Sequence, residues 1–189
     1  MGRVLCYIYD GMADFEISLL LHRLRNTGKK EIISISESVE VVVAQSGLRY
    51  IPDMKIHEIK CIDDIEALII PGGPIDNSRN DICQLAIDII NNGKLLAAIC
   101  FGPQFLGRAA ILDHYLYTTS CSAEKIKQLG CKEPFNRKNY VHKRIVVDRN
   151  LITAQGYAFV DFAMEVCRYM KIFTTKQQAY EQIGRIKEG

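Results

Sequence analysis

Five consecutive apolar residues, Leu95–Ile99, run directly into Cys100, and Gly102 and Pro103 follow two and three positions later. An apolar run of this length is typical of a strand buried on both faces of a parallel sheet. Proline suits the first turn of a helix, because its missing N–H would have no partner there. The segment therefore predicts a buried strand, a tight turn that holds Cys100, and a helix.

Strand and helix patterns alternate in the same way along the chain, which predicts a doubly wound α/β fold, with a mostly parallel sheet and helices on both faces. Strands are expected at Val4–Tyr9, Glu31–Ser36, Glu40–Ala44, Leu48–Tyr50, Ala67–Ile70, Leu95–Ile99, Tyr115–Thr118, Tyr140–His142, Ile145–Val147 and Leu151–Ala154. Helices are expected at Asp14–Asn26, with Asp14 as N-cap, at Asn80–Asn91, from Pro103 to near Leu112, at Ala123–Leu129 and at Phe159–Met170. We expect residues 1–172 to form one domain and residues 173–189 to be a helical extension of it.

Charge and apolar patterning exclude several classes of protein. The net charge is +2 and the longest basic clusters are two residues long, so we expect no nucleic-acid partner. The longest apolar run, Leu95–Phe101, is far shorter than the roughly 20 residues of a membrane-spanning helix. The seven cysteines include no Cys-x-x-Cys pair, so we expect no metal or other cofactor and a reducing, cytoplasmic location.

Cys100 lies where a nucleophile elbow would place its reactive residue, with small residues, Ala98 and Gly102, two positions to either side. Taken alone, a cysteine after an apolar run is more often a packing residue. In this context, however, the sulfur would lie at the start of a helix, whose positive end favours the nucleophilic thiolate. We therefore interpret Cys100 as the functional residue.

Two further segments follow predicted strands and so belong at the same edge of the sheet. The amide of Gly73, next to Gly72, would approach a substrate oxygen without hindrance, and with the Phe101 amide it would form an oxyanion hole. By itself the Gly72–Gly73 pair fits an ordinary turn better than an oxyanion hole. Glu16 either complements its helix dipole or contacts Cys100. In the second case it must be protonated and donate a hydrogen bond, because an ionised carboxylate disfavours a thiolate.

On these residues the chain resembles the ThiJ/PfpI superfamily, which includes deglycases and PfpI-type intracellular proteases and is related to class I glutamine amidotransferases. The similarity covers about Val4 to Met170. It rests on segment 10–16, with Asp14 and Glu16, on segments 68–73 and 97–103, and on segment 153–156, which ends in Gly156. The resemblance implies a flavodoxin-like sheet, a Cys100 thiolate assisted by protonated Glu16, ready oxidation of Cys100, and a homodimer.

The chain departs from the family pattern at two positions. Phe101 stands where the protease-like branch has a histidine, and Ser120 matches the place of another catalytic histidine. The neighbouring Cys121 is either a resolving thiol for Cys100 or a packing cysteine, and the packing interpretation is favoured by about three to one. A Cys–His dyad is therefore not expected, which weakens amidase and peptidase chemistry most, because a leaving amine needs a general acid.

The leading hypothesis is an enzyme, a hydrolase or lyase, in which Cys100 attacks a small carbonyl, amide or related electrophilic substrate. Glyoxalase, deglycase, hydratase and amidase chemistries all fit this hypothesis. Around Cys100, Glu16, Gly73 and Phe101, the candidate pocket comprises Gly72, Asp14, Ser120, Cys121 and Gly156. Two alternatives stay open. One is a redox sensor or oxidative-stress protein that functions through oxidation of Cys100. The other is a small-molecule binding module on a degenerate enzyme scaffold.

Overall fold

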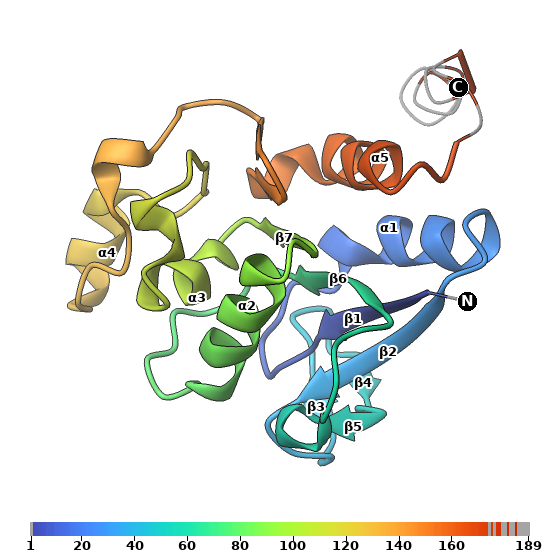
Figure 1. Cartoon of the computed structure of the whole chain (residues 1–189). Coiled ribbons are helices and arrows are strands. Elements are labelled where there is room, and N and C mark those ends of the chain that lie inside the picture. Colours follow the sequence, from blue (N-terminus) through green and yellow to red (C-terminus); the bar gives the residue numbers. More distant parts are fainter. Residues whose placement is uncertain (1, 174, 176, 179–180, 182–183, 185–189) are drawn as a thin grey trace.

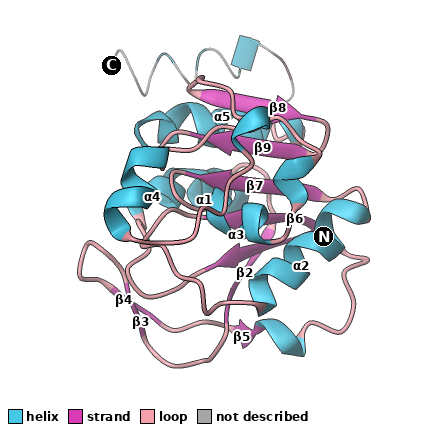
Figure 2. Cartoon of the chain, turned by 90° about the vertical axis from the view of Figure 1, so that its left-hand side faces the viewer, coloured by secondary structure: helices cyan, strands magenta, loops and turns pink. Residues whose placement is uncertain are grey.

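Seven strands form one sheet in the order β5-β2-β1-β6-β7-β9-β8, in a computed structural model that describes residues 2–173, 175, 177, 178, 181 and 184. All pairings are parallel except that of β8 with β9. Figure 2 shows the strands stacked one above another. Their bounds are β1 Arg3–Tyr7, β2 Glu31–Ser36, β5 Met54–Lys55, β6 Ile65–Ile70, β7 Leu95–Ile99, β8 Ile145–Asp148 and β9 Leu151–Ala154.

Helices cover both faces of this sheet (Figure 1). Helices α1 (Phe15–Asn26) and α5 (Phe159–Tyr169) lie side by side on one face, and α2 (Asp81–Asn91) and α3 (Pro103–Arg108) lie on the other. Helix α4 (Ala123–Leu129) stands apart, beyond α3. The strands β2-β1-β6-β7-β9 follow the flavodoxin-like order, so the predicted doubly wound fold is confirmed.

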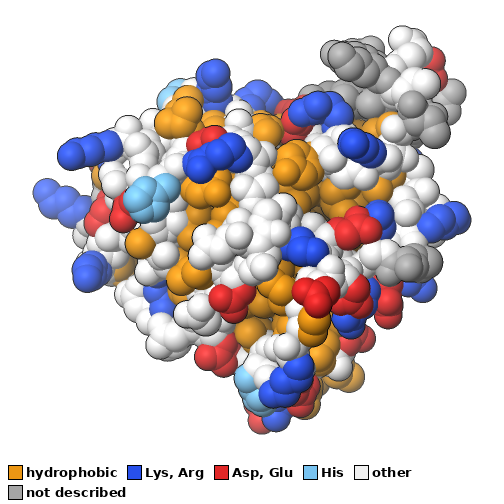
Figure 3. All heavy atoms as spheres, in the orientation of Figure 1, with side chains coloured by type: hydrophobic (Ala, Val, Ile, Leu, Met, Phe, Trp, Pro, Cys, Tyr) orange, Lys and Arg blue, Asp and Glu red, His pale blue; other side chains and the backbone are white. Residues whose placement is uncertain are grey.

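Apolar periodicity explains which surfaces meet. Every residue of β7 and of β9 is buried, as a central strand covered by helices on both faces requires. Helix α1 buries Ile17, Leu20 and Leu24, three and four residues apart, so one stripe of the helix faces the core. Its exposed residues are polar apart from Phe15, namely Ser18, His22, Arg25 and Asn26. Over the face of the molecule in Figure 3, Lys and Arg are interspersed with Asp and Glu.

Two predicted strands are wrong. Residues 115–118 and 140–142 form no strand and share a single bridge, between Tyr117 and Tyr140. Side chains take the place of strand partners here, since the N–H of Thr118 donates to the hydroxyl of Thr153 rather than to a carbonyl. Residues 40–44 and 48–50 shrink to β3 (Val42–Val43) and β4 (Arg49–Tyr50), which pair in a separate two-stranded ribbon. The short edge strand β5 was not predicted.

Helix ends also differ from the prediction. Helix α3 ends at Arg108 because the chain turns at Ala110, which has a φ of +57°, before a short 3-10 turn at Ile111–Asp113. Asp14 occupies the N-cap position of α1, but its side chain makes no capping hydrogen bond. Most of the predicted extension at 173–189 lies outside the described residues. No helix in the described part of the chain is long and apolar enough to span a membrane.

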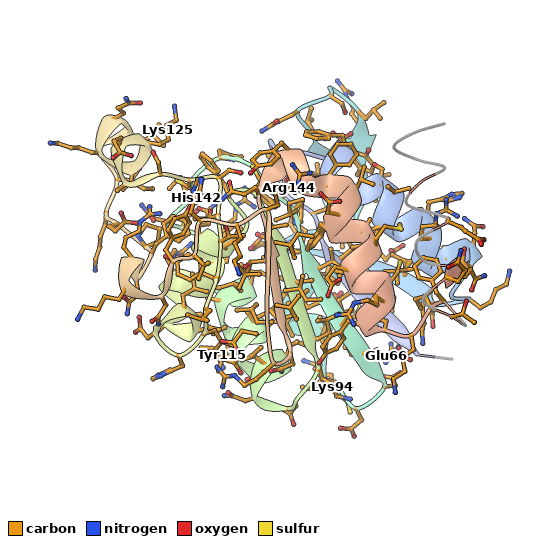
Figure 4. The ribbon with its side chains drawn as sticks, turned by 90° about the horizontal axis from the view of Figure 1, so that it is seen from above. Glu66, Lys94, Tyr115, Lys125, His142 and Arg144 are labelled. Atoms are coloured by element: carbon orange, nitrogen blue, oxygen red, sulfur yellow. The ribbon has the colours of Figure 1, made fainter. Side chains whose placement is uncertain are left out.

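The parallel strands point their carboxyl ends toward one edge of the sheet, and the loops after β1, β6, β7 and β9 therefore converge there. Figure 4 shows this edge, where Lys125, His142 and Arg144 lie, and the opposite edge, where Glu66, Lys94 and Tyr115 lie. The fold thus brings four segments that are distant in sequence to one place.

Candidate functional site

Cys100 occupies a strained turn between β7 and α3. Its φ is +62°, a left-handed conformation that costs a non-glycine residue roughly 1–3 kcal/mol. Backbone hydrogen bonds hold this conformation: the Cys100 N–H donates to Ala154 O at 2.8 Å, and Cys100 O accepts from Ser120 N at 3.0 Å and from Thr119 Oγ1 at 2.6 Å. The turn lifts a half-buried sulfur above the sheet edge.

Glu16 reaches the same point from the first turn of α1. Its side chain is buried, and Oε2 accepts a hydrogen bond from the N–H of Gly72 at 2.7 Å. The Cys100 thiol and the Glu16 carboxyl are also hydrogen-bonded to each other. The loop after β6 therefore anchors the carboxyl group, and the carboxyl group in turn contacts the sulfur.

Two glycines enclose this pair. A Cβ atom at Gly72 would stand 2.6 Å from both Cys100 Cβ and Glu16 Oε2. A Cβ atom at Gly156 would stand 2.8 Å from Glu16 Oε1 and 2.9 Å from Cys100 Sγ. These separations are below any normal carbon contact, so only glycine fits at either position.

Enclosure dictates how the pair ionises. Burial, and after it the charge of the Glu16 carboxylate, raises the pKa of the Cys100 thiol to about 12. Burial also raises the pKa of Glu16 above its ordinary value. Two negative charges are therefore unfavourable in this space, and near neutral pH the two groups hold one proton between them. The helix-terminus argument, which predicted a thiolate, does not by itself decide the ionisation.

Two donors stabilise negative charge on the sulfur. The hydroxyl of Ser120 and the backbone N–H of Phe101 are hydrogen-bonded to Cys100 and act to lower the pKa of the thiol. Ser120 Oγ also accepts the N–H of Gly156 at 2.8 Å, and this leaves its proton free to donate to the sulfur. Ser120 thus supplies a neutral donor beside the sulfur.

A cavity of about 390 Å³ opens over the pair. Gly73 borders it, and the Gly73 N–H makes no hydrogen bond within the described part of the chain. Two exposed aromatic side chains, Phe15 and Tyr157, are also among the lining residues, with 54% and 62% of their surface accessible. The lining residues are Ala13, Phe15, Glu16, Gln45, Gly73, Cys100, Phe101, Ser120, Gly156 and Tyr157.

Three residues of the predicted pocket do not line this cavity. Gly72 touches the pair from behind without lining the cavity. The Asp14 carboxylate accepts hydrogen bonds from Ser46 and Tyr50, away from Cys100. Cys121 is fully buried, and burial raises the pKa of its thiol to about 11.

Several residues at the cavity were not identified from the sequence. Phe15, Gln45 and Tyr157 line it, but each lies in a loop or at a helix end without a periodic pattern. Thr119, whose hydroxyl holds the Cys100 carbonyl, had only its position beside Ser120 to indicate a role. None of the four histidines lines the cavity, and the described residues contain no cluster of three metal-ligating side chains.

Comparison with known proteins finds matches over most of the chain. The model of a family described as the DJ-1/PfpI family matches residues 2–169. An uncharacterized protein of Archaeoglobus fulgidus is 31% identical over 159 residues, covering 81% of this chain and 88% of the relative. A deglycase of Thermococcus kodakarensis is 26% identical, covering 81% of this chain and 89% of that protein.

Two further matches lie in the same group. A glutathione-independent glyoxalase of Caenorhabditis elegans is 26% identical, covering 74% of this chain and 73% of its own. The crystal structure of a DJ-1 superfamily protein from Agrobacterium tumefaciens superposes with a TM-score of 0.84 at 26% identity and covers 100% of both chains.

Proposed function

The chain belongs to the DJ-1/PfpI family, and from its site we propose that it is a Cys100-dependent enzyme that adds its sulfur to the carbonyl carbon of small α-oxoaldehydes. The observation that carries this proposal is the pair of Cys100 and Glu16, which holds one proton beneath an open cavity. Relatives named as deglycase and glyoxalase support the same substrate class.

Addition to a carbonyl needs the groups that this cavity contains. The sulfur supplies the electron pair and the Cys100–Glu16 pair supplies one proton. Gly73, whose N–H makes no hydrogen bond in the described part of the chain, borders the cavity in which a carbonyl oxygen would lie. Amide cleavage requires in addition a general acid for the leaving amine. Among the described residues that line the cavity, Glu16 is the only carboxylate and there is no histidine, lysine or arginine, so carbonyl chemistry is favoured over peptidase or amidase chemistry.

The proposed reaction balances without a cofactor. The Cys100 sulfur bonds to the aldehyde carbon, and the proton that it shares with Glu16 moves to the carbonyl oxygen, giving a hemithioacetal. The Glu16 carboxylate then removes the hydrogen from that carbon and returns it to the neighbouring carbon, while the hydroxyl proton of the hemithioacetal passes to the neighbouring ketone oxygen, giving the thioester of a 2-hydroxy acid. Water cleaves the thioester to a 2-hydroxy acid and restores the thiol, so the net change is addition of one water molecule.

Conversion of methylglyoxal to lactate tests the proposal. We expect the wild-type protein to consume methylglyoxal without glutathione, Cys100→Ser to lose this activity, and Cys61→Ser to retain it, because Cys61 is exposed and lies outside the cavity. Absence of lactate from the wild type, or an unchanged rate in Cys100→Ser, would overturn the proposal.

Oxidation of Cys100 is a second candidate function, favoured by the two donors beside the sulfur. Ser120 and the Phe101 N–H would hydrogen-bond the oxygens of a sulfinate as readily as a thiolate. Peroxide treatment followed by mass spectrometry distinguishes the two functions. Conversion of Cys100 to sulfinic acid by about two equivalents of peroxide, which is the amount the two oxidation steps consume, without any aldehyde turnover, supports the redox role. The homodimer implied by the family resemblance and the cytoplasmic location expected from the cysteines stay predictions.

A further inference from the structure

A second cavity, of about 480 Å³, adjoins the one over Cys100. Gln45, Gly73 and Phe101 line both cavities, so the two cavities meet at these residues. Cavities that bind small ligands typically measure about 300–1,000 Å³, and each of the two reaches this range alone. A three-carbon dicarbonyl would fill only a small part of the combined space, which therefore has room for a larger substrate.

The second cavity differs in chemistry from the first. Its walls are mostly apolar and include Pro74, Ile75 and Leu129, the last with 46% of its surface exposed. Among the residues that the structure describes, no carboxylate lines it and Lys125 is its one charged lining residue. A ligand group that lies here would therefore have an apolar body and would meet a single positive charge.

Lys125 is available for such an ion pair. It extends from α4, and in the described part of the chain its ammonium lies within ion-pair distance of no carboxylate. Figure 4 places Lys125 at the same edge of the sheet as Arg144. Arg144, in contrast, is already paired with Asp161 and stacked on Tyr157, 4.9 Å from its ring centre.

We propose that the second cavity is a substrate subsite, and that the enzyme prefers α-oxoaldehydes that carry a carboxylate beyond an apolar spacer. The aldehyde carbon lies at the Cys100 sulfur, the spacer crosses Phe101 and contacts Ile75 and Leu129, and the carboxylate pairs with Lys125. This subsite rests on the proposed function, since it assigns the substrate class of the same reaction.

The test compares phenylglyoxal with 4-carboxyphenylglyoxal, which differ in one carboxylate. The readout is the ratio of the two kcat/KM values within one variant, with methylglyoxal turnover measured alongside. We expect the wild type to prefer the carboxylated substrate by about fivefold, which is the scale of one partly exposed ion pair. Lys125→Gln abolishes this preference and Lys125→Glu reverses it.

Lys127→Gln is the matched control, because Lys127 lies on the same helix but does not line either cavity. Its ratio equals that of the wild type. The subsite is refuted if methylglyoxal is turned over and Lys125→Gln keeps the wild-type ratio. If none of the three aldehydes is turned over, the proposed function fails and the subsite falls with it, so the two failures are distinguishable.

Discussion

Replacement of Glu16 by Gln changes the pH dependence of Cys100 reactivity in a way that follows from the shared proton. Gln retains a carbonyl oxygen that can accept the Gly72 N–H, so the loop after β6 keeps its anchor. What the variant loses is the second titrating group beside the sulfur. The perturbation therefore isolates the proton that Glu16 and Cys100 hold in common.

The magnitude follows from counting protons. In the wild type the pair holds one proton until the thiol pKa of about 12 is approached. The reactive form is the one in which the shared proton lies on Glu16 and the charge on the Cys100 sulfur, and its fraction is constant over the neutral range because the number of bound protons does not change. We expect the Cys100 alkylation rate to change by less than about twofold between about pH 6.5 and 8.5. In Glu16→Gln the sulfur titrates alone, and burial still holds its pKa above the ordinary value of roughly 8.5. Its rate then rises by about tenfold per pH unit, or about a hundredfold over the same range.

Alkylation with iodoacetamide, followed at each cysteine by mass spectrometry, measures both profiles. Cys61 is exposed and serves as an internal control, with the same profile in both proteins. Parallel, steeply rising Cys100 profiles in the wild type and in Glu16→Gln would refute the shared proton. A flat profile in both proteins would refute it equally.

Three further predictions concern the same site. Because burial raises the pKa of Glu16, the folded state binds the Glu16 proton more tightly than the unfolded state does. Protonation of Glu16 therefore stabilises the folded wild type. This stabilisation is complete below the pKa of Glu16 in the unfolded chain and is lost as the pH rises through the pKa of Glu16 in the folded protein. The melting temperature of Glu16→Gln minus that of the wild type should therefore increase from about pH 4 to about pH 8, and a constant difference in thermal unfolding would contradict this. Ser120→Ala removes a donor from the sulfur and the acceptor of the Gly156 N–H, so we expect alkylation of Cys100 at neutral pH to slow by about fivefold and unfolding free energy, from urea titration, to fall by about 1 kcal/mol. Gly156→Ala forces a methyl group against the sulfur and should cost at least about a hundredfold in methylglyoxal turnover, as a displacement of about 1 Å can; wild-type turnover in this variant would show that the pair has more room than its contacts indicate.

The sequence by itself determined the order of layers and the position of the elbow. The apolar runs at β6 and β7, and the periodic stripes on α1 and α5, identify buried strands and amphipathic helices because burial imposes those periods locally. Cys100 was identified in the same way, since strand, small residue and helix start lie within eight residues of one another.

The local sequence pattern gave wrong predictions where a residue's hydrogen-bond partners come from distant segments of the chain. Residues 115–118 have the composition of a strand, yet the side chain of Thr153 takes the hydrogen bond that a strand neighbour would accept. Asp14 precedes a helix and reads as a cap, but Ser46 and Tyr50 bind its carboxylate instead. In both cases a tertiary contact outweighs a preference worth about 1 kcal/mol.

Tertiary structure alone decided how the site is charged. The sequence placed Cys100 at a helix start, where the local field lowers a thiol pKa. The fold then buried the sulfur against Glu16, between Gly72 and Gly156, and raised the pKa of the thiol to about 12. Burial and a neighbouring charge act through space and not along the chain, so the shared proton follows only from the assembled fold.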